Sequence, residues 1–142
     1  MDLHEWAKRW QIPHQAIREL QDQMGVTPSL TAPEPGNEAS VVKKVRLEAA
    51  RKGIILWRNN VGVATDTQGR VIRYGLANDS KRVNDSIKSS DLVGIKPDGQ
   101  FIARECKRPG WHFTGTPREI AQRKFIELVL VMGGDAEFTT GD

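Results

Sequence analysis

Residues 91–107 read DLVGIKPDGQFIARECK, two short apolar runs separated by a turn, and this stretch decides the fold. Asp91 opens the first run, and Glu105, Cys106 and Lys107 close the second. Because successive side chains of a strand point to opposite faces, Glu105 and Lys107 share one face and Cys106 takes the other. The stretch therefore predicts a β-hairpin that carries a carboxylate and an amine side by side.

The turn between the two runs determines which residues face one another. Residues 96–99 read KPDG, which is typical of a type I turn followed by a left-handed glycine, a three-residue hairpin loop with a bulge. That loop pairs Lys96 with Gln100 and, counting back along both strands, Asp91 with Glu105. A two-residue loop would shift the pairing by one residue and turn Asp91 to the wrong face. The turn therefore favours a register with both carboxylates on one face.

Two facing carboxylates beside a lysine suit a hard divalent cation. Mg²⁺ takes oxygen ligands, keeps several waters and commonly completes its shell with substrate phosphate oxygens. The lysine can then orient or deprotonate a water, while the metal offsets phosphate charge and activates that water, as in metal-assisted phosphodiester hydrolysis. The same three residues also suit a partly buried ion pair at a sheet edge, and alone they leave both interpretations open.

Asp91 and the triplet at 105–107 resemble the core of the PD-(D/E)XK nucleases. The wider runs SSDLVG at 89–94 and ARECK at 103–107 are similar to the VRR-NUC branch of that superfamily. Ser90 stands where the superfamily's pattern has proline, as is common in this branch. The combined pattern is far more specific than the triplet alone.

Further matches surround this core. A helical stretch begins at Asn37-Glu38 and ends at Gly53, and the run LWRNNVG at 56–62 follows, similar to the family's first helix and strand. Gln122 lies in a downstream helix where the family carries a glutamine. The resemblance implies a VRR-NUC nuclease domain at 38–142 with an α/β, restriction-endonuclease-like fold, a mixed sheet flanked by helices.

The resemblance also implies the residues of the site. The catalytic set would be Lys107, Glu105, Asp91, Glu38 and Gln122. The ligands of Mg²⁺ or Mn²⁺ would be Asp91, Glu105, Glu38 and the backbone carbonyl of Cys106. Lys107 would orient the water or stabilise the transition state. Glu38 has a second interpretation as a partner of the helix dipole, worth a few tenths of a kcal/mol, and the resemblance favours the metal role.

Positive charge around this set indicates a polyanionic partner. Residues 43–124 contain 18 Lys and Arg against 8 Asp and Glu, a net charge of +10, whereas the whole chain carries +3. Such a domain suits DNA. The residues expected to contact DNA are Arg58, Asn59, Arg108 and Arg123. For Asn59, which Asn60 follows, a turn is an equally open interpretation, because asparagine pairs often mark turns.

The resemblance implies an Mg²⁺- or Mn²⁺-dependent endodeoxyribonuclease that hydrolyses phosphodiester bonds to leave 5′-phosphate and 3′-hydroxyl ends. Similarity to stand-alone phage and bacterial members implies a homodimer acting on branched DNA such as Holliday junctions, since two active sites on a two-fold axis match a two-fold junction. Two alternatives stay open: a non-catalytic nucleic-acid-binding protein on the same fold, and a nuclease of flaps or linear duplex DNA.

Residues 1–30 are expected to form a separate helical extension, because apolar residues recur at helical spacing on both sides of Pro13. The run WAKRWQIP at 6–13 faintly resembles the first half of a helix-turn-helix. No clear recognition helix follows, so a role in packing or dimerisation is favoured over base reading. A transcription regulator that binds DNA through this N-terminal arm is disfavoured for the same reason. Residues 31–37, with Pro33 and Pro35, are typical of a stiffened linker.

The composition fits a protein of the reducing cytoplasm, and the resemblance implies that of a bacterium or a phage-infected host cell. No apolar run approaches the ~18 residues needed to span a bilayer, so no membrane partner is expected. A signal peptide is not recognisable, and the single cysteine allows no internal disulfide. Cys106 is expected to be a small packed hydrophobe rather than a nucleophile.

Periodicity and turn residues predict the other elements. We expect a first strand at 54–58, apolar on both faces as in a covered central strand, a hairpin of 61–64 with 71–74, a loop or frayed helix at 77–88, and a closing strand at 136–140. A capping box at 116–119 begins the last helix, and Gly133 ends it. The expected buried side of that helix comprises Ile120, Phe125, Leu128, Val129 and Met132.

Overall fold

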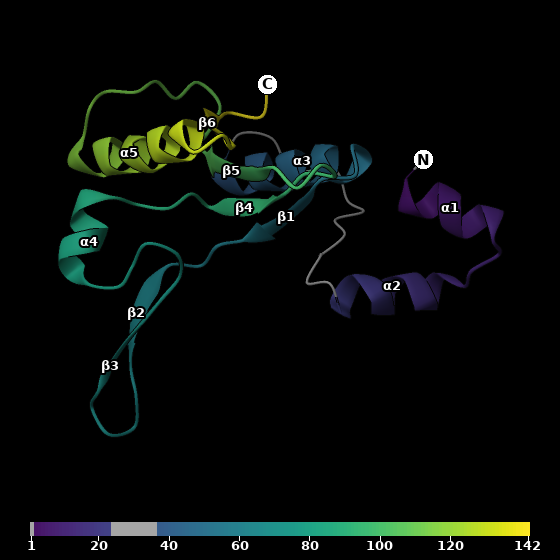
Figure 1. Cartoon of the computed structure of the whole chain (residues 1–142), viewed down its shortest axis with the longest axis horizontal. Coiled ribbons are helices and arrows are strands. Elements are labelled where there is room, and N and C mark those ends of the chain that lie inside the picture. The colour runs from purple at the N-terminus through teal and green to yellow at the C-terminus, as the bar shows by residue number, and fades with distance from the viewer. Residues whose placement is uncertain (1, 24–36) are drawn as a thin grey trace.

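A four-stranded mixed sheet is the centre of the structure, a computed structural model that describes residues 2–23 and 37–142. Its strands lie in the order β1-β4-β5-β6 (Figure 1), with β5 and β6 parallel and the other pairs antiparallel. The strands are β1 (Ile55–Arg58), β4 (Leu92–Ile95), β5 (Phe101–Cys106) and β6 (Asp135–Thr139), and the two long helices are α3 (Glu38–Arg51) and α5 (Pro117–Val131). The chain thus has a mixed α/β fold.

The β4–β5 hairpin has the predicted register. Leu92 lies opposite Arg104, and the Lys96 amide donates to the Gln100 carbonyl at 2.9 Å. The turn closes with a 2.9 Å hydrogen bond from the Gly99 amide to the Lys96 carbonyl. Gly99 has φ of +89°, the left-handed conformation that the turn requires and glycine favours. The turn chemistry therefore aligns Asp91 with Glu105, as the sequence predicted.

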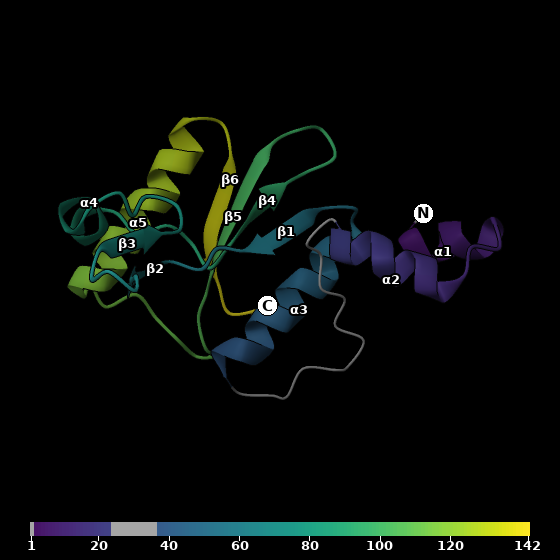
Figure 2. The ribbon, with the colours of Figure 1, turned by 90° about the horizontal axis from the view of Figure 1, so that it is seen from below.

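The two long helices cover opposite faces of the sheet, which lies between them in Figure 2. α3 packs on the face that contains Leu92 and Cys106, and α5 packs on the face that contains Ala103. Since side chains alternate along a strand, Asp91 and Glu105 lie on the α5 face. The carboxylate pair is thus at one end of the sheet, on the side of α5.

The helices begin and end close to the predicted caps. Asn37 is the N-cap of α3, and Thr116 with Glu119 forms the capping box of α5. Gly133, just past the end of α5, has φ of +91°, as a C-terminal glycine stop requires. A short helix, α4 (Lys81–Ser86), forms in the segment expected to be a loop or frayed helix.

The predicted buried side of α5 is partly wrong. Phe125 and Val129 are buried as expected, but Ile120 is 37% exposed, Leu128 44% and Met132 79%. The face that meets the sheet is set by Gln122, Phe125 and Val129, at helical spacing, and Leu128 is about 100° away from it. Met132 is the C-cap residue, where the chain turns back towards β6. Ala121, Gln122 and Ile126 are buried instead, with Ile126 in the core cluster under the sheet.

The position of β1 in the sheet also differs from the prediction. β1 pairs with β4 alone, so it is an edge strand rather than a central one. Apolar residues on both faces of a strand indicate that helices or loops cover those faces. They do not report whether another strand lies alongside, which depends on residues elsewhere in the chain.

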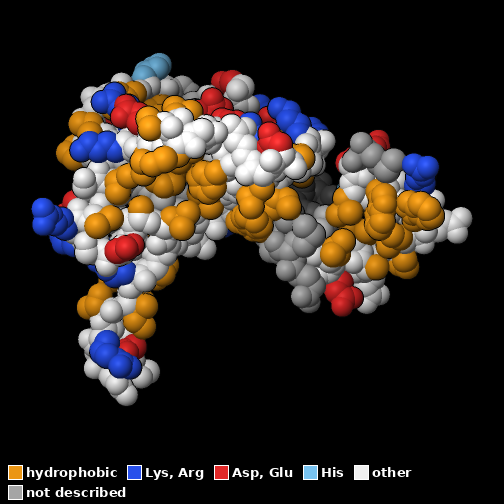
Figure 3. Space-filling view, in the orientation of Figure 1, with side chains coloured by type: hydrophobic (Ala, Val, Ile, Leu, Met, Phe, Trp, Pro, Cys, Tyr) orange, Lys and Arg blue, Asp and Glu red, His pale blue; other side chains and the backbone are white. Residues whose placement is uncertain are grey.

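The segment between β1 and α4 forms the predicted hairpin as a separate two-stranded sheet of β2 (Gly62–Thr65) and β3 (Val71–Tyr74). It projects away from the main sheet (Figure 1), and its apolar side chains, Val63 and Val71 among them, are exposed (Figure 3). Buried Asn78 holds its base, donating to carbonyls of both strands at 2.8 Å. Arg73 of β3 in turn donates to the Asn78 carbonyl and side-chain oxygens, so the base of this appendage is fastened around Asn78.

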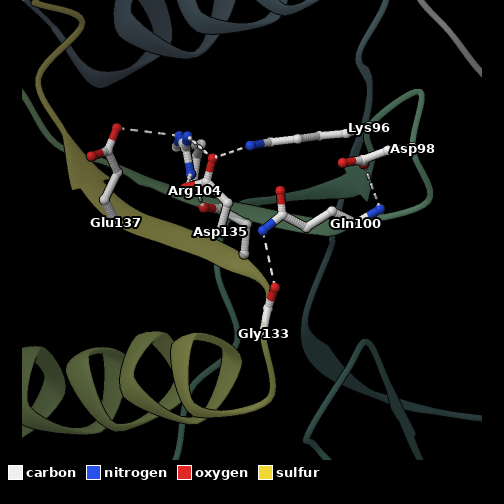
Figure 4. Close-up of polar contacts among 8 residues, drawn as sticks. Lys96, Asp98, Gln100, Arg104, Gly133, Asp135 and Glu137 are labelled. Atoms are coloured by element: carbon white, nitrogen blue, oxygen red, sulfur yellow. Dashed lines mark hydrogen bonds and ion pairs between the residues drawn. The ribbon is translucent and has the colours of Figure 1, made fainter.

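On the α3 face, β5 and β6 are joined by ion pairs (Figure 4). Arg104 donates to both carboxylate oxygens of Asp135 at 2.9 and 3.0 Å, Lys96 lies 2.7 Å from the same carboxylate, and Glu137 lies 3.3 Å from Arg104. These cations hold the pKa of Asp135 down at about 2, chiefly through the Arg104 hydrogen bonds. The cluster ties the parallel strands β5 and β6 together.

The N-terminal region contains the two predicted helices, α1 (Leu3–Arg9) and α2 (His14–Gln23). Of the predicted linker at 31–37, only Asn37, the cap of α3, falls within the described residues. In the described ranges, none of the helices is long and apolar enough to cross a membrane.

Candidate functional site

Asp91 and Glu105 are held against each other at the end of the β4–β5 hairpin. The Asp91 amide donates to Oε2 of Glu105 at 3.2 Å. One residue further along β5, the Cys106 amide donates to Oδ2 of Asp91 at 2.9 Å. Each carboxylate is thus oriented by the backbone of the opposite strand. This cross-bonding is available only in the register that the turn selects.

Gln122 of α5 joins Glu105 to Lys107. Its Nε2 donates to Oε1 of Glu105 at 2.9 Å, and its Oε1 accepts from Nζ of Lys107 at 2.8 Å. The direct distance between Lys107 Nζ and Glu105 Oε1 is 3.9 Å. Gln122 is only 3% exposed, so the amide is locked in a position that keeps the amine and the carboxylate at a fixed separation.

Aromatic rings surround the Lys107 side chain. Its Nζ lies 5.4 Å from the centre of the Trp111 ring and 5.8 Å from that of Phe138. Cations at such distances are attracted to the ring faces. The side chain is 12% exposed, and one amide oxygen and two rings define its position. The Lys107 ammonium therefore has a fixed orientation.

Burial and the neighbouring carboxylate raise the pKa of Glu105 to about 8. Loss of water around the charged form is the larger cause, and repulsion from Asp91 is the next; attraction to Lys107 opposes both. Glu105 therefore retains its proton near neutral pH when no other cation is present. Attraction to Lys107 thus does not fully offset burial and the repulsion from Asp91.

The raised pKa of Glu105 predicts a pH dependence of stability. Between pH 4.5 and about 8 the native state keeps a proton that the unfolded state has lost, so the free energy of unfolding falls as pH rises through that window. We expect a fall of roughly a few kcal/mol from pH 5 to pH 9 in EDTA, measured by denaturant unfolding. Glu105→Gln should flatten the curve, and equal slopes in both proteins would contradict the assignment.

Cys106 takes the packed position that the sequence predicted. Its side chain is fully buried among the residues under α3, and burial raises the pKa of the thiol to about 12. The N–H and C=O of one strand residue point to the same edge. Because the Cys106 N–H bonds to Asp91, its carbonyl lies on the edge where the carboxylates are.

Glu38 is not brought together with the other two carboxylates. It is the first residue of α3, which packs on the opposite face of the sheet. It is close enough to contribute to the raised pKa of the Cys106 thiol. In residues 2–23 and 37–142, no group of three or more His, Cys, Asp or Glu side chains is placed to hold a metal ion. The metal role of Glu38 stays a prediction.

The residues expected to contact DNA have different surroundings. Arg58 and Arg108 are exposed. Arg123 lies with its guanidinium 4.4 Å from the centre of the Phe113 ring. Asn59 instead fastens the site from within: its Nδ2 donates to Ser89 and to the Ser90 carbonyl, and its Oδ1 accepts from the Leu76 amide. A structural role, rather than DNA contact, thus accounts for the hydrogen bonds of both polar side-chain atoms of Asn59.

Glu119 has a role beyond its cap that the sequence analysis missed. Besides Thr116, it accepts from Nε1 of Trp111 at 2.9 Å and from the amide and hydroxyl of Thr114 at 3.3 and 2.9 Å. These bonds fasten the loop after Lys107 to the first turn of α5. The pKa of Glu119 is lowered to about 2, chiefly by the hydrogen bond from the Thr116 amide and then by those from Thr114. The capping-box pattern identifies one partner only, since the others come from a loop without regular periodicity.

The buried environment of Ser90 was also not predicted from the sequence. It is 1% exposed, directly before Asp91, and among the described residues its Oγ has no hydrogen-bond partner. Its backbone carbonyl accepts from Asn59. The small side chain lets the chain pass through the core immediately before the site.

Comparison with protein-family models, with curated proteins and with solved structures gave no match to this chain.

Proposed function

We propose that the protein is an Mg²⁺- or Mn²⁺-dependent endodeoxyribonuclease with a restriction-endonuclease-like PD-(D/E)XK core of the VRR-NUC type. One observation carries the proposal: Asp91 and Glu105 are cross-bonded on one face, with Lys107 joined to Glu105 through buried Gln122. A simple structural ion pair would need one acid and one cation. Here two acids face each other, and their repulsion is relieved only in part.

The donor set suits a hard divalent cation. Two carboxylates and the nearby Cys106 carbonyl are oxygen ligands, and Mg²⁺ is commonly held by one or two carboxylates with waters and substrate phosphate. Burial and then repulsion from Asp91 raise the pKa of Glu105, and the positive charge of a divalent ion would oppose both effects. Such an ion would offset phosphate charge and favour ionisation of a bound water. Glu38, at the start of α3, is a further candidate ligand.

The chain's own residues would position the reactants. Lys107, held by Gln122 at 2.8 Å, would donate to the attacking water or to a non-bridging phosphate oxygen and stabilise charge in the transition state. Gln122 would keep the ammonium at a fixed distance from Glu105. Because these groups are already ordered, little reorganisation is needed at the moment of reaction.

The surface around the site is suited to DNA. The net charge of +10 in residues 43–124 favours a polyanion, and the exposed cations Arg58, Arg108 and Arg123 would contact phosphates. We extend the proposal to a homodimer acting on branched DNA, because two-fold related sites match the symmetry of a four-way junction.

A cleavage assay tests the function. Labelled four-way junction, flap, single-stranded and linear duplex DNA are incubated with Mg²⁺, Mn²⁺ or EDTA. Metal-dependent cutting of the junction, absent in EDTA, is the expected result for wild type. Asp91→Asn should abolish cutting and leave binding intact or tighter, since Asn can still accept from the Cys106 amide. Asp98→Asn, in the turn of the same hairpin, is the matched control and should cut normally.

The other outcomes each identify an alternative. Equal cutting of all substrates would keep the nuclease and reject the preference for branched DNA. Binding without cutting under any metal would support the non-catalytic nucleic-acid-binding protein. The lack of a three-residue metal group among the described side chains is the observation that favours that alternative.

A further inference from the structure

Three aromatic rings cluster beside the catalytic lysine. The centres of Trp111 and Phe138 are 4.9 Å apart, those of Phe113 and Phe138 6.1 Å, and those of Trp111 and Phe113 6.5 Å with nearly perpendicular planes. Trp111 and Phe138 both face the Lys107 ammonium. One ring therefore separates Phe113 from the amine at the centre of the proposed chemistry.

The loop that carries Trp111 and Phe113 is fixed in place. Glu119 of α5 accepts hydrogen bonds from Trp111, Thr114 and Thr116, and it is 6% exposed. The Trp111 amide also donates to the Arg108 carbonyl at 3.1 Å. Phe113 is thus presented by a preformed loop, and binding a ligand there would cost little ordering.

Phe113 is only partly needed to cover the core. Trp111 makes the closest ring contact with Phe138, whereas Phe113 remains 36% exposed. The Arg123 guanidinium lies 4.4 Å from the centre of the Phe113 ring, and the Arg123 side chain is 49% exposed. An accessible flat ring and a flat cation therefore adjoin each other next to the site.

We propose that Phe113 and Arg123 form a stacking site for one unpaired nucleobase next to the scissile phosphate. The inference rests on the proposed function and names what makes the substrate selective. Every base has a π-face that stacks on aromatic and guanidinium planes, at roughly 1–3 kcal/mol per base. A base inside a duplex must first be unstacked, at a cost of a few kcal/mol. Branch points and flaps offer bases for which that cost is lower.

Binding to abasic DNA tests the inference without cleavage. Flap DNA is prepared with the base removed at one position at a time across the branch point, and its dissociation constant is measured by fluorescence anisotropy in EDTA. At one position, wild type should bind the intact flap about 5- to 150-fold more tightly than the abasic one. In Phe113→Leu and in Arg123→Gln that ratio should fall towards one, because base and side chain act as a pair.

Two matched variants serve as controls. Phe101→Leu removes a ring of similar exposure, 37%, on the same strand face as Glu105 but at the other end of the sheet, and Lys124→Gln removes the cation that adjoins Arg123 in the sequence. Both should keep the wild-type ratio. Arg123 is exposed, so its variant preserves the fold and tests the proposal if Phe113→Leu is destabilised.

The outcomes separate this inference from the proposed function. If the ratio of dissociation constants depends on the base and on Phe113 but no DNA is cut, the stacking site is supported and the nuclease proposal is rejected. Cutting by wild type with no base dependence at any position overturns the stacking site and keeps the nuclease. Loss of the ratio in the Phe101 and Lys124 controls as well would also overturn it.

Discussion

Lys107→Ala is expected to lower the rate of metal-dependent DNA cleavage by about 10²- to 10⁴-fold. The ammonium is held by the Gln122 oxygen at 2.8 Å and by two ring faces, so in the proposed reaction it would meet the transition state without reorganising. Removing a positioned donor of this kind affects the chemical step more than binding. Single-turnover cleavage at saturating protein should show the loss, whereas the dissociation constant for DNA in EDTA should change little.

The matched control for this prediction is Lys124→Ala, an exposed cation of α5. It removes the same charge from the domain but leaves the site intact, so its single-turnover rate should stay close to that of wild type. Equal cleavage by Lys107→Ala and wild type would mean that Lys107 has a structural role only, and its assignment to the transition state would be abandoned.

Gly94→Ala is expected to lower the free energy of unfolding by more than about 3 kcal/mol. A Cβ at Gly94 would lie 1.7 Å from the Ile55 carbonyl oxygen and 3.0 Å from the Leu56 Cα. Both are backbone atoms of β1, so no side-chain rotation relieves the overlap. β1 would have to separate from β4, exposing buried Leu56 and breaking the bond from the Asn59 amide to the Asp91 carbonyl.

Denaturant unfolding of Gly94→Ala and Gly99→Ala would measure this effect. Gly99 has φ of +89°, but a Cβ there meets nothing within 4 Å. Its substitution should therefore cost only the strain of a left-handed residue, roughly 1–2 kcal/mol. If the two variants lost the same stability, the close approach of β1 and β4 at Gly94 would not be a determinant of the fold.

The candidate site was predictable in part. The facing of Asp91 and Glu105 follows from one turn, because its loop length dictates the register of both strands. The link from Lys107 through Gln122 was only implied by resemblance, since strand and helix residues meet here across the α5 packing interface. Among the described residues Glu38 does not form a three-carboxylate group with the pair, and this was not predictable, because a position on a helix says nothing about which face of the sheet that helix covers.

By itself, the sequence determined the elements whose causes are local. The caps at Asn37 and Thr116, the Gly99 turn and the alternation of Glu105 with Cys106 depend on backbone conformations and hydrogen bonds within a few residues. Only the tertiary structure decided that β1 is an edge strand, that Leu128 is exposed, and that burial beside a second carboxylate raises the pKa of Glu105. These properties depend on which distant segments lie alongside and exclude water, and no short window of residues encodes that.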